Sequence, residues 1–205
     1  HCEVEIIAPR TYKGSERSFK LYAIEAREIT HNLPKDQDPI LWRIITTHPV
    51  DTLEQAQQCI AWYKQRWLIE ELFRVMKTKG FKIESSQLAS GSSIKKLISF
   101  TLEAALNIMR IKLALESNCQ VLADIVFTDK QIILLSLFNN KVEGKTAKQK
   151  NPYQNKTLPW ASWIIARLGK WSGYKSHGPP GYITIKNGYD SFNDQYQLFE
   201  LLYNK

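Results

Sequence analysis

Hydrophobic and polar positions alternate along the first fifty residues of the chain, as they do in half-buried strands. Three segments carry this pattern in full or in part: Cys2–Ala8, Phe19–Ile29 and Ile40–Thr47. The connections between them are rich in proline, glycine and charged residues. The pattern therefore predicts a small antiparallel sheet of three strands.

After residue 51 the spacing of apolar positions changes to that of helices. A long helix is expected from Thr52 to Lys79, because Asp51 or Thr52 can serve as its N-cap and Gly80 ends it. A second helix, capped by Ser93, is apolar around much of its circumference, which predicts burial. Three more are expected at 128–138, 157–169 and 189–203. Residues 139–157 are polar, basic and weakly hydrophobic, which predicts a mobile segment.

These elements place the chain in the α+β class. We expect a β-rich subdomain at residues 1–51, a helical segment at 52–90 and a mostly helical domain at 91–205. No run of about 18 apolar residues is present, so no membrane-spanning helix is expected.

One stripe of the long helix carries the candidate chemistry. At roughly 100° per residue, five side chains fall within a sector of about 80°: Tyr63, Arg66, Glu70, Arg74 and Lys77. A single carboxylate among cations suits an acid that binds a metal ion while its neighbours hold phosphates. The alternative is an exposed glutamate that pairs with Arg66 or Arg74 one helical turn away. Glu71 lies about 100° away from Glu70 and is expected to be structural.

The spacing Tyr-x2-Arg-x3-Glu-x6-Lys resembles the signature of bacterial insertion-sequence transposases of the DDE class, which are cut-and-paste enzymes. Trp42 lies 21 positions before Tyr63 in a predicted strand, as in that family, and the block Trp160–Gly169 resembles the end of such enzymes. The resemblance runs through nearly the whole chain. It implies the C-terminal part of an RNase H-like catalytic core with a β-strand insertion, followed by a mostly helical domain that mediates dimerisation.

The resemblance also implies a role for each residue of the stripe. Glu70 would join two aspartates to hold two Mg²⁺ or Mn²⁺ ions, and Tyr63, Arg66, Arg74 and Lys77 would hold the DNA backbone near the scissile phosphate. Trp42 would stack on a flipped base, while the ordinary alternative is a core tryptophan on a strand. Trp62 and Trp67 lie off the centre of the stripe and are expected to pack internally.

The other two carboxylates of such a site are not evident in these residues. Asp36, Asp38 and Asp51 lie in predicted loops or at a helix cap, and none is a convincing replacement. We therefore expect the two aspartates to precede His1, and the 205 residues alone to be inactive in cutting and joining DNA. A DNA-binding or dimerising remnant that inhibits an intact transposase is the alternative function, and a structural helical assembly domain is a third.

Charge and cysteine content agree with a DNA-acting bacterial protein without deciding the matter. The net charge of +8 favours a polyanionic partner. The resemblance implies that this partner is double-stranded DNA and that the protein binds it as a homodimer. Three cysteines without metal-ligand spacing favour the reducing cytoplasm. The resemblance implies association with the bacterial nucleoid. The basic stretch Lys141–Lys156 is expected either to meet DNA phosphates or to be a solvated linker. The last helix would either dimerise or fold back on its own domain.

Overall fold

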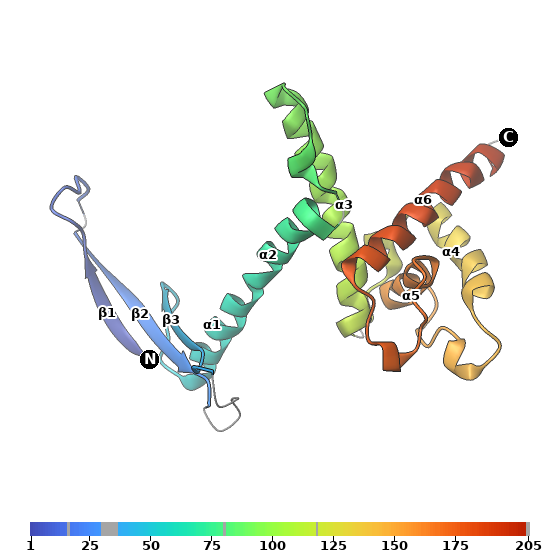
Figure 1. Ribbon diagram of the computed structural model, residues 1–205. Coiled ribbons are helices and arrows are strands. Elements are labelled where there is room, and N and C mark those ends of the chain that lie inside the picture. The colour runs from blue at the N-terminus through green and yellow to red at the C-terminus, as the bar shows by residue number, and fades with distance from the viewer. Residues whose placement is uncertain (16, 30–36, 80, 118, 204–205) are drawn as a thin grey trace. The chain divides into compact units, whose positions relative to one another are not determined.

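The computed structural model describes residues 1–15, 17–29, 37–79, 81–117 and 119–203 (Figure 1). The chain divides into two compact units, His1–Glu70 and Glu71–Lys205, here called the N-terminal unit and the C-terminal unit. The mixture of strands and helices confirms the α+β class. The three-part division at residues 51 and 90 stays a prediction. Within the described residues, no helix is long and apolar enough to cross a membrane.

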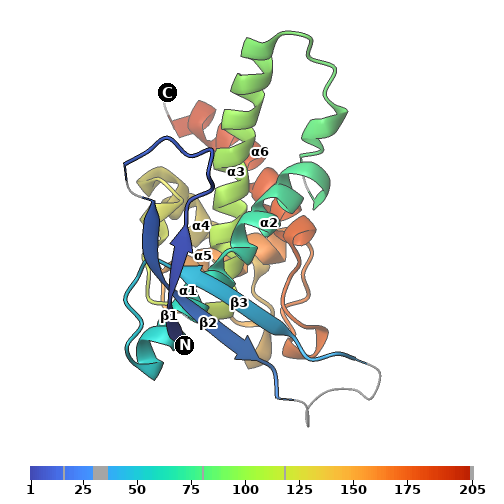
Figure 2. The ribbon, with the colours of Figure 1, turned by 90° about the vertical axis from the view of Figure 1, so that its left-hand side faces the viewer.

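The N-terminal unit contains a three-stranded antiparallel sheet in the order β1-β2-β3 (Figure 2). Its strands are β1 (Cys2–Ile7), β2 (Ser18–Arg27) and β3 (Leu41–Thr46), so the three predicted strands are confirmed to within two residues at each end. The core of this unit is small. It consists of Ile24 from the sheet and three residues from the following segment: Val50, Ala56 and Cys59.

Helix α1 (Leu53–Gln65) begins at Thr52, which resolves the two candidate N-caps. The Gln55 N–H donates to the Thr52 hydroxyl at 3.3 Å, and the Thr52 N–H donates to the Gln55 side chain at 3.1 Å. This reciprocal pair satisfies two backbone donors that the first turn leaves unpaired.

The prediction of one uninterrupted helix from residue 52 to 79 is wrong, because the segment is divided into α1, α2 and a π-helical turn. The Arg66 N–H bonds to the Tyr63 carbonyl at 3.1 Å, which tightens the backbone before α2 (Trp67–Arg74) begins. A π-helical turn, Val75–Lys79, follows α2. Val75 and Met76 are both buried there, so the wider turn accompanies the burial of two consecutive side chains.

The C-terminal unit is built around α5 (Leu158–Leu168), whose residues from Leu158 to Ala166 are all buried. Three longer helices pack against α5 (Figure 1): α3 (Gly91–Ser117), α4 (Asp129–Val142) and α6 (Tyr182–Tyr203). A helix that is apolar all round must lie in the middle of its unit, because every face needs an apolar neighbour. Thr128 and Thr157 are the N-caps of α4 and α5, at the residues where the sequence predicts these helices to begin.

Two helix boundaries and one burial prediction are corrected. Helix α3 starts at Gly91, where Ser90 accepts from the Ser93 N–H at 3.5 Å, so Ser93 is not its cap. Only the part of α3 from Thr101 onward is buried, on one face, whereas Phe100 is 72% exposed. Helix α6 starts at Tyr182 instead of 189, and its first turn buries Tyr182 and Ile185.

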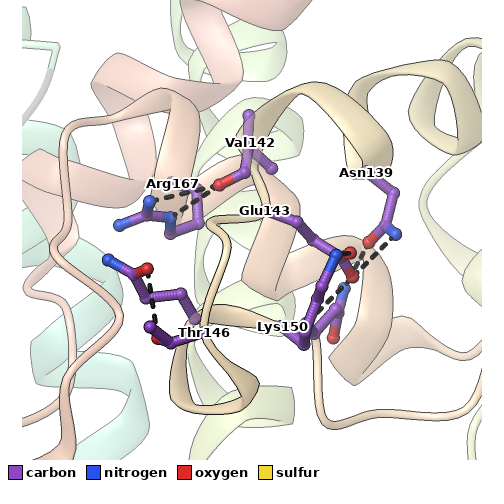
Figure 3. Close-up of polar contacts among 8 residues, drawn as sticks. Asn139, Val142, Glu143, Thr146, Lys150 and Arg167 are labelled. Carbon is purple, nitrogen blue, oxygen red and sulfur yellow. Dashed lines mark hydrogen bonds and ion pairs between the residues drawn. The ribbon is translucent and has the colours of Figure 1, made fainter.

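The stretch 139–157 is not the mobile segment that its composition predicts. The Glu143 carboxylate accepts from the Lys150 ammonium at 2.9 Å, from the Asn151 N–H at 3.0 Å and from the Asn139 amide at 3.1 Å (Figure 3). The Arg167 guanidinium donates to the Val142 carbonyl from Nε at 3.3 Å and from Nη2 at 3.1 Å. Polar side chains thus hold this segment, and composition alone does not show that they pair with each other.

Candidate functional site

Trp42 on β3 and Tyr63 on α1 lie side by side in the N-terminal unit. Their ring centroids are 5.3 Å apart and their planes meet at 68°, an edge-to-face contact. Trp42 is opposite Ala26 in the register of β2 and β3, and its side chain is half-buried. The packing of α1 on the sheet therefore brings together two residues that are 21 positions apart.

Cations flank both rings of this pair. The Lys64 ammonium lies 6.0 Å from the centroid of the Trp42 ring, and the Arg66 guanidinium lies 5.5 Å from that of Tyr63. At these distances the negative face of each ring attracts the positive charge. The order along the surface is Lys64, Trp42, Tyr63, Arg66, with cations at both ends and aromatic rings between them.

Glu70 follows Arg66 in this series of contacts, and Trp42, Tyr63, Arg66 and Glu70 are here called the row. Nη1 of Arg66 donates to Oε1 of Glu70 at 2.5 Å, and the Glu70 side chain is 43% exposed. The hydrogen bond to Glu70, and then the charge of that carboxylate, raise the pKa of Arg66, so the guanidinium remains charged. Glu70 is thus an accessible carboxylate held in place by a cation, not a group buried in apolar packing.

A cavity of about 280 Å³ opens beside Trp42. Arg27, Glu28 and Ile40 line it from the sheet side, and Ile60 and Lys64 line it from α1. An aromatic ring with a cation at the rim of a cavity can bind a planar ring that carries a phosphate.

Arg74 and Lys77 lie in the C-terminal unit and pair with other carboxylates. Nη2 of Arg74 donates to Oε2 of Glu71 at 2.5 Å, and Nζ of Lys77 lies 2.8 Å from Oε1 of Glu84. Glu71 is buried, as expected of a structural residue. Burial, and then the charge of Glu71, raise the pKa of Tyr182 to about 12. The increment of 100° per residue that placed Lys77 on the stripe does not hold through the π-helical turn.

The structure therefore links Trp42, Tyr63, Arg66 and Glu70 by direct contacts, and it gives Arg74 and Lys77 separate partners. Sequence reasoning missed Lys64, since its position over Trp42 depends on how α1 lies on the sheet. It was also wrong to expect internal packing of Trp62 and Trp67, which are 47% and 59% exposed.

The donors in the described residues do not make a complete metal site. No group of three or more His, Cys, Asp or Glu side chains that could hold an ion occurs among them. Asp36 falls outside the described residues. Glu70 supplies a single carboxylate, which fits one ligand of a hard divalent cation and not a two-ion centre by itself.

A comparison with protein families matches residues 4–108, just over half of the chain, to the transposase DDE domain. The chain belongs to this family. The matched range contains the sheet, α1, α2 and most of α3, so every residue of the candidate site falls inside the transposase domain. The family assigns a transposase function and DNA as the substrate class. Helices α4, α5 and α6 lie beyond the match.

Proposed function

We propose that this chain is the C-terminal part of a metal-dependent DDE transposase that cuts and joins DNA at transposon ends, with Glu70 as a catalytic carboxylate. The observation that carries the proposal is the row of contacts from Trp42 through Tyr63 and Arg66 to Glu70. An accessible carboxylate is thus paired with a cation that also contacts an aromatic ring, inside the family's domain.

Each residue of the row has a chemical role in this proposal. The planar guanidinium of Arg66 can bind a phosphate with two parallel hydrogen bonds while it keeps Glu70 in position. The Tyr63 hydroxyl adds a donor for the same backbone, and Trp42 offers a ring on which an unpaired base stacks. Arg74 and Lys77 contribute further positive charge along the DNA.

Glu70 would be one ligand of a Mg²⁺ or Mn²⁺ pair, and the remaining carboxylates would come from outside the described residues. When bound, such ions supply Lewis-acid activation for phosphoryl transfer. The exposed apolar side chains of Trp62, Trp67 and Ile69 support this arrangement, because a helix of a catalytic core packs such residues against further chain. It follows that the 205 residues alone neither nick nor join DNA.

DNA binding tests the row directly. In fluorescence anisotropy with duplex DNA, Arg66→Ala is expected to weaken binding by about 1–3 kcal/mol if the guanidinium contacts a phosphate in a charge-assisted pair. Arg43→Ala is the matched control, since Arg43 also forms an exposed salt bridge with a glutamate, at 3.0 Å. Equal affinity of the two variants for the duplex would refute a DNA-binding role for Arg66.

The catalytic role of Glu70 is tested where these residues are joined to the segment that carries the other carboxylates. Glu70→Gln is expected to abolish nicking of transposon-end DNA while binding of that DNA survives. Glu84→Gln, which removes another exposed carboxylate with a cationic partner, is expected to leave nicking intact. Cleavage retained by Glu70→Gln would end the assignment.

The second candidate is a DNA-binding or dimerising transposase remnant without catalysis, favoured by the single carboxylate in the described site. It predicts DNA binding that weakens steeply with salt and is indifferent to divalent metal. If Arg66→Ala combined with Lys77→Ala leaves DNA binding unchanged, a structural assembly domain replaces both functions.

We also propose that the chain acts as a homodimer on bacterial nucleoid DNA. Leu198, Leu201 and Leu202 on α6 and Ile133 and Leu137 on α4 are all more than half exposed. Exposed apolar side chains of this kind are suited to a contact surface between two copies of the chain. Leu201→Glu is expected to convert a dimer to a monomer in sedimentation equilibrium, and a wild-type monomer would refute the proposal.

A further inference from the structure

Four aromatic residues meet at one cavity of the C-terminal unit, beyond the part of the chain that matches the transposase domain. The cavity has a volume of about 550 Å³ and is lined by Tyr153, Trp163, Trp171 and Tyr174. Trp163 is only 3% exposed and lies deep in the unit, whereas Tyr174 is 38% exposed. The lining therefore runs from a buried indole to an accessible phenol.

Hydrogen bonds hold the accessible rings in place. The Trp171 indole N–H donates to the Gly178 carbonyl at 3.0 Å, and the Tyr174 hydroxyl accepts from the Gln149 amide at 2.9 Å. The Tyr174 ring also contacts the His177 ring edge-on, with 5.9 Å between centroids. Rings that are fixed before a ligand binds lose little entropy on binding.

Arg167 forms hydrogen bonds where the two segments that line the cavity begin, at the end of α4 and just after α5. Besides its bonds to Val142 (Figure 3), its Nη1 donates to the Trp171 carbonyl at 2.8 Å and to the Ser172 carbonyl at 2.5 Å. Its guanidinium lies 5.6 Å from the Trp163 ring. The segment after α4 and the turn after α5 are thus anchored to one side chain. Hydrogen bonds from Arg167 therefore fix the two segments that line the cavity.

The rim of the cavity is basic. Residues 141–156 contain five lysines and one glutamate, Glu143, whose carboxylate already binds Lys150. Lys148 lines the cavity together with Lys150 and is exposed. An ammonium group at the mouth of an aromatic cavity suits a ligand with a planar ring and an adjacent anionic group.

We propose that this cavity binds an unpaired nucleobase of single-stranded DNA, with the base stacked on the aromatic lining and its phosphate held by Lys148. The proposal rests on the DNA-acting function of the chain and adds a second contact, separate from Trp42 and outside the matched domain. The lysines favour a nucleotide over a proline-rich peptide, because such a peptide brings no anion to the rim.

The test compares oligonucleotides and matched variants. Tryptophan fluorescence and anisotropy are measured with a labelled ten-nucleotide oligo-dT, with an abasic strand of the same length, and with decaproline. Tyr174→Ala is expected to weaken oligo-dT binding by about fivefold or more, as loss of one stacked base does. Phe100→Ala is its control, since Phe100 is an exposed aromatic residue of the same unit, on α3.

Lys148→Ala is expected to weaken oligo-dT binding and to reduce the magnitude of the salt slope by about 0.7, the value for one phosphate contact with a single strand. Lys95→Ala, an exposed lysine on α3, is the control and should change neither quantity. Equal binding of the abasic strand, or binding of decaproline in place of oligo-dT, would overturn the nucleobase site.

The experiments distinguish failure of the cavity proposal from failure of the proposed function. If Tyr174→Ala and Lys148→Ala bind oligo-dT as their controls do while Arg66→Ala still loses duplex binding, the cavity proposal alone is wrong. If Arg66→Ala also binds the duplex like its control, the proposed function is wrong as well. Loss of oligo-dT binding in both cavity variants, with normal duplex binding, supports the cavity.

Discussion

Two glycines let the backbones of α5 and α6 touch, and replacing one of them gives a prediction whose size follows from the geometry. A Cβ added at Gly188 on α6 would lie 1.9 Å from the Ile165 carbonyl oxygen and 2.8 Å from the Gly169 nitrogen. Both neighbours are backbone atoms, so no side-chain rotation relieves the overlap. Since ordinary contacts begin at 3.4 Å, the helices must separate by about 1.5 Å.

That separation disturbs a fully buried part of the C-terminal unit. Ile165 on α5 and Ile185 and Phe192 on α6 are all 0% exposed, so they lose contacts when the helices move apart. Overpacking of this kind costs about 1–3 kcal/mol, and sometimes more. The better helix propensity of alanine returns about 0.8–1.0 kcal/mol. We therefore expect Gly188→Ala to lower the free energy of unfolding of this unit by about 1 kcal/mol or more.

Urea unfolding followed by the fluorescence of the buried Trp160 and Trp163 measures this change. Gly91→Ala is the matched control, because Gly91 is also helical and a Cβ there would meet nothing within 4 Å. The control should be neutral or slightly stabilised. If Gly188→Ala unfolds at the same urea concentration as Gly91→Ala, the close contact between α5 and α6 is refuted.

Three further predictions concern single groups of the C-terminal unit. Burial and the charge of Glu71 raise the pKa of Tyr182 from 10.0 to about 12. The neutral phenol therefore contributes fully to the free energy of unfolding below pH 10, and this contribution is lost as the pH rises toward 12. Absorbance at 295 nm together with urea midpoints should show this loss, and Tyr182→Phe should abolish it. Thr128→Ala removes the N-cap of α4 and should cost about 1 kcal/mol in urea unfolding, whereas an unchanged midpoint would contradict the cap. Burial raises the pKa of Glu143, but hydrogen bonds from Lys150, Asn151 and Asn139 outweigh it and lower the pKa below 4.5. Its contribution to the free energy of unfolding is therefore present above pH 4.5 and is lost as the pH falls through the lowered pKa. Urea midpoints from tryptophan fluorescence at acid pH should show this loss in the wild type and not in Glu143→Gln.

Local features of this protein follow from the sequence alone. The three strands, the caps at Thr52, Thr128 and Thr157 and the contact of Arg66 with Glu70 depend on residues within a few positions of each other. Alternation of apolar and polar residues predicts a strand, and a threonine hydroxyl that accepts from a nearby backbone N–H predicts a helix start. Both signals lie within a few residues. Family membership was also predictable, because the spacing of the motif is itself a property of the sequence.

The tertiary structure decided which distant residues meet. Lys64 and Tyr63 both contact Trp42 because α1 packs beside β3. The paired glycines of α5 and α6 and the aromatic cavity likewise join residues from different elements. No local pattern encodes such contacts, since their free energy comes from burial and hydrogen bonding between segments that the folded chain alone brings together.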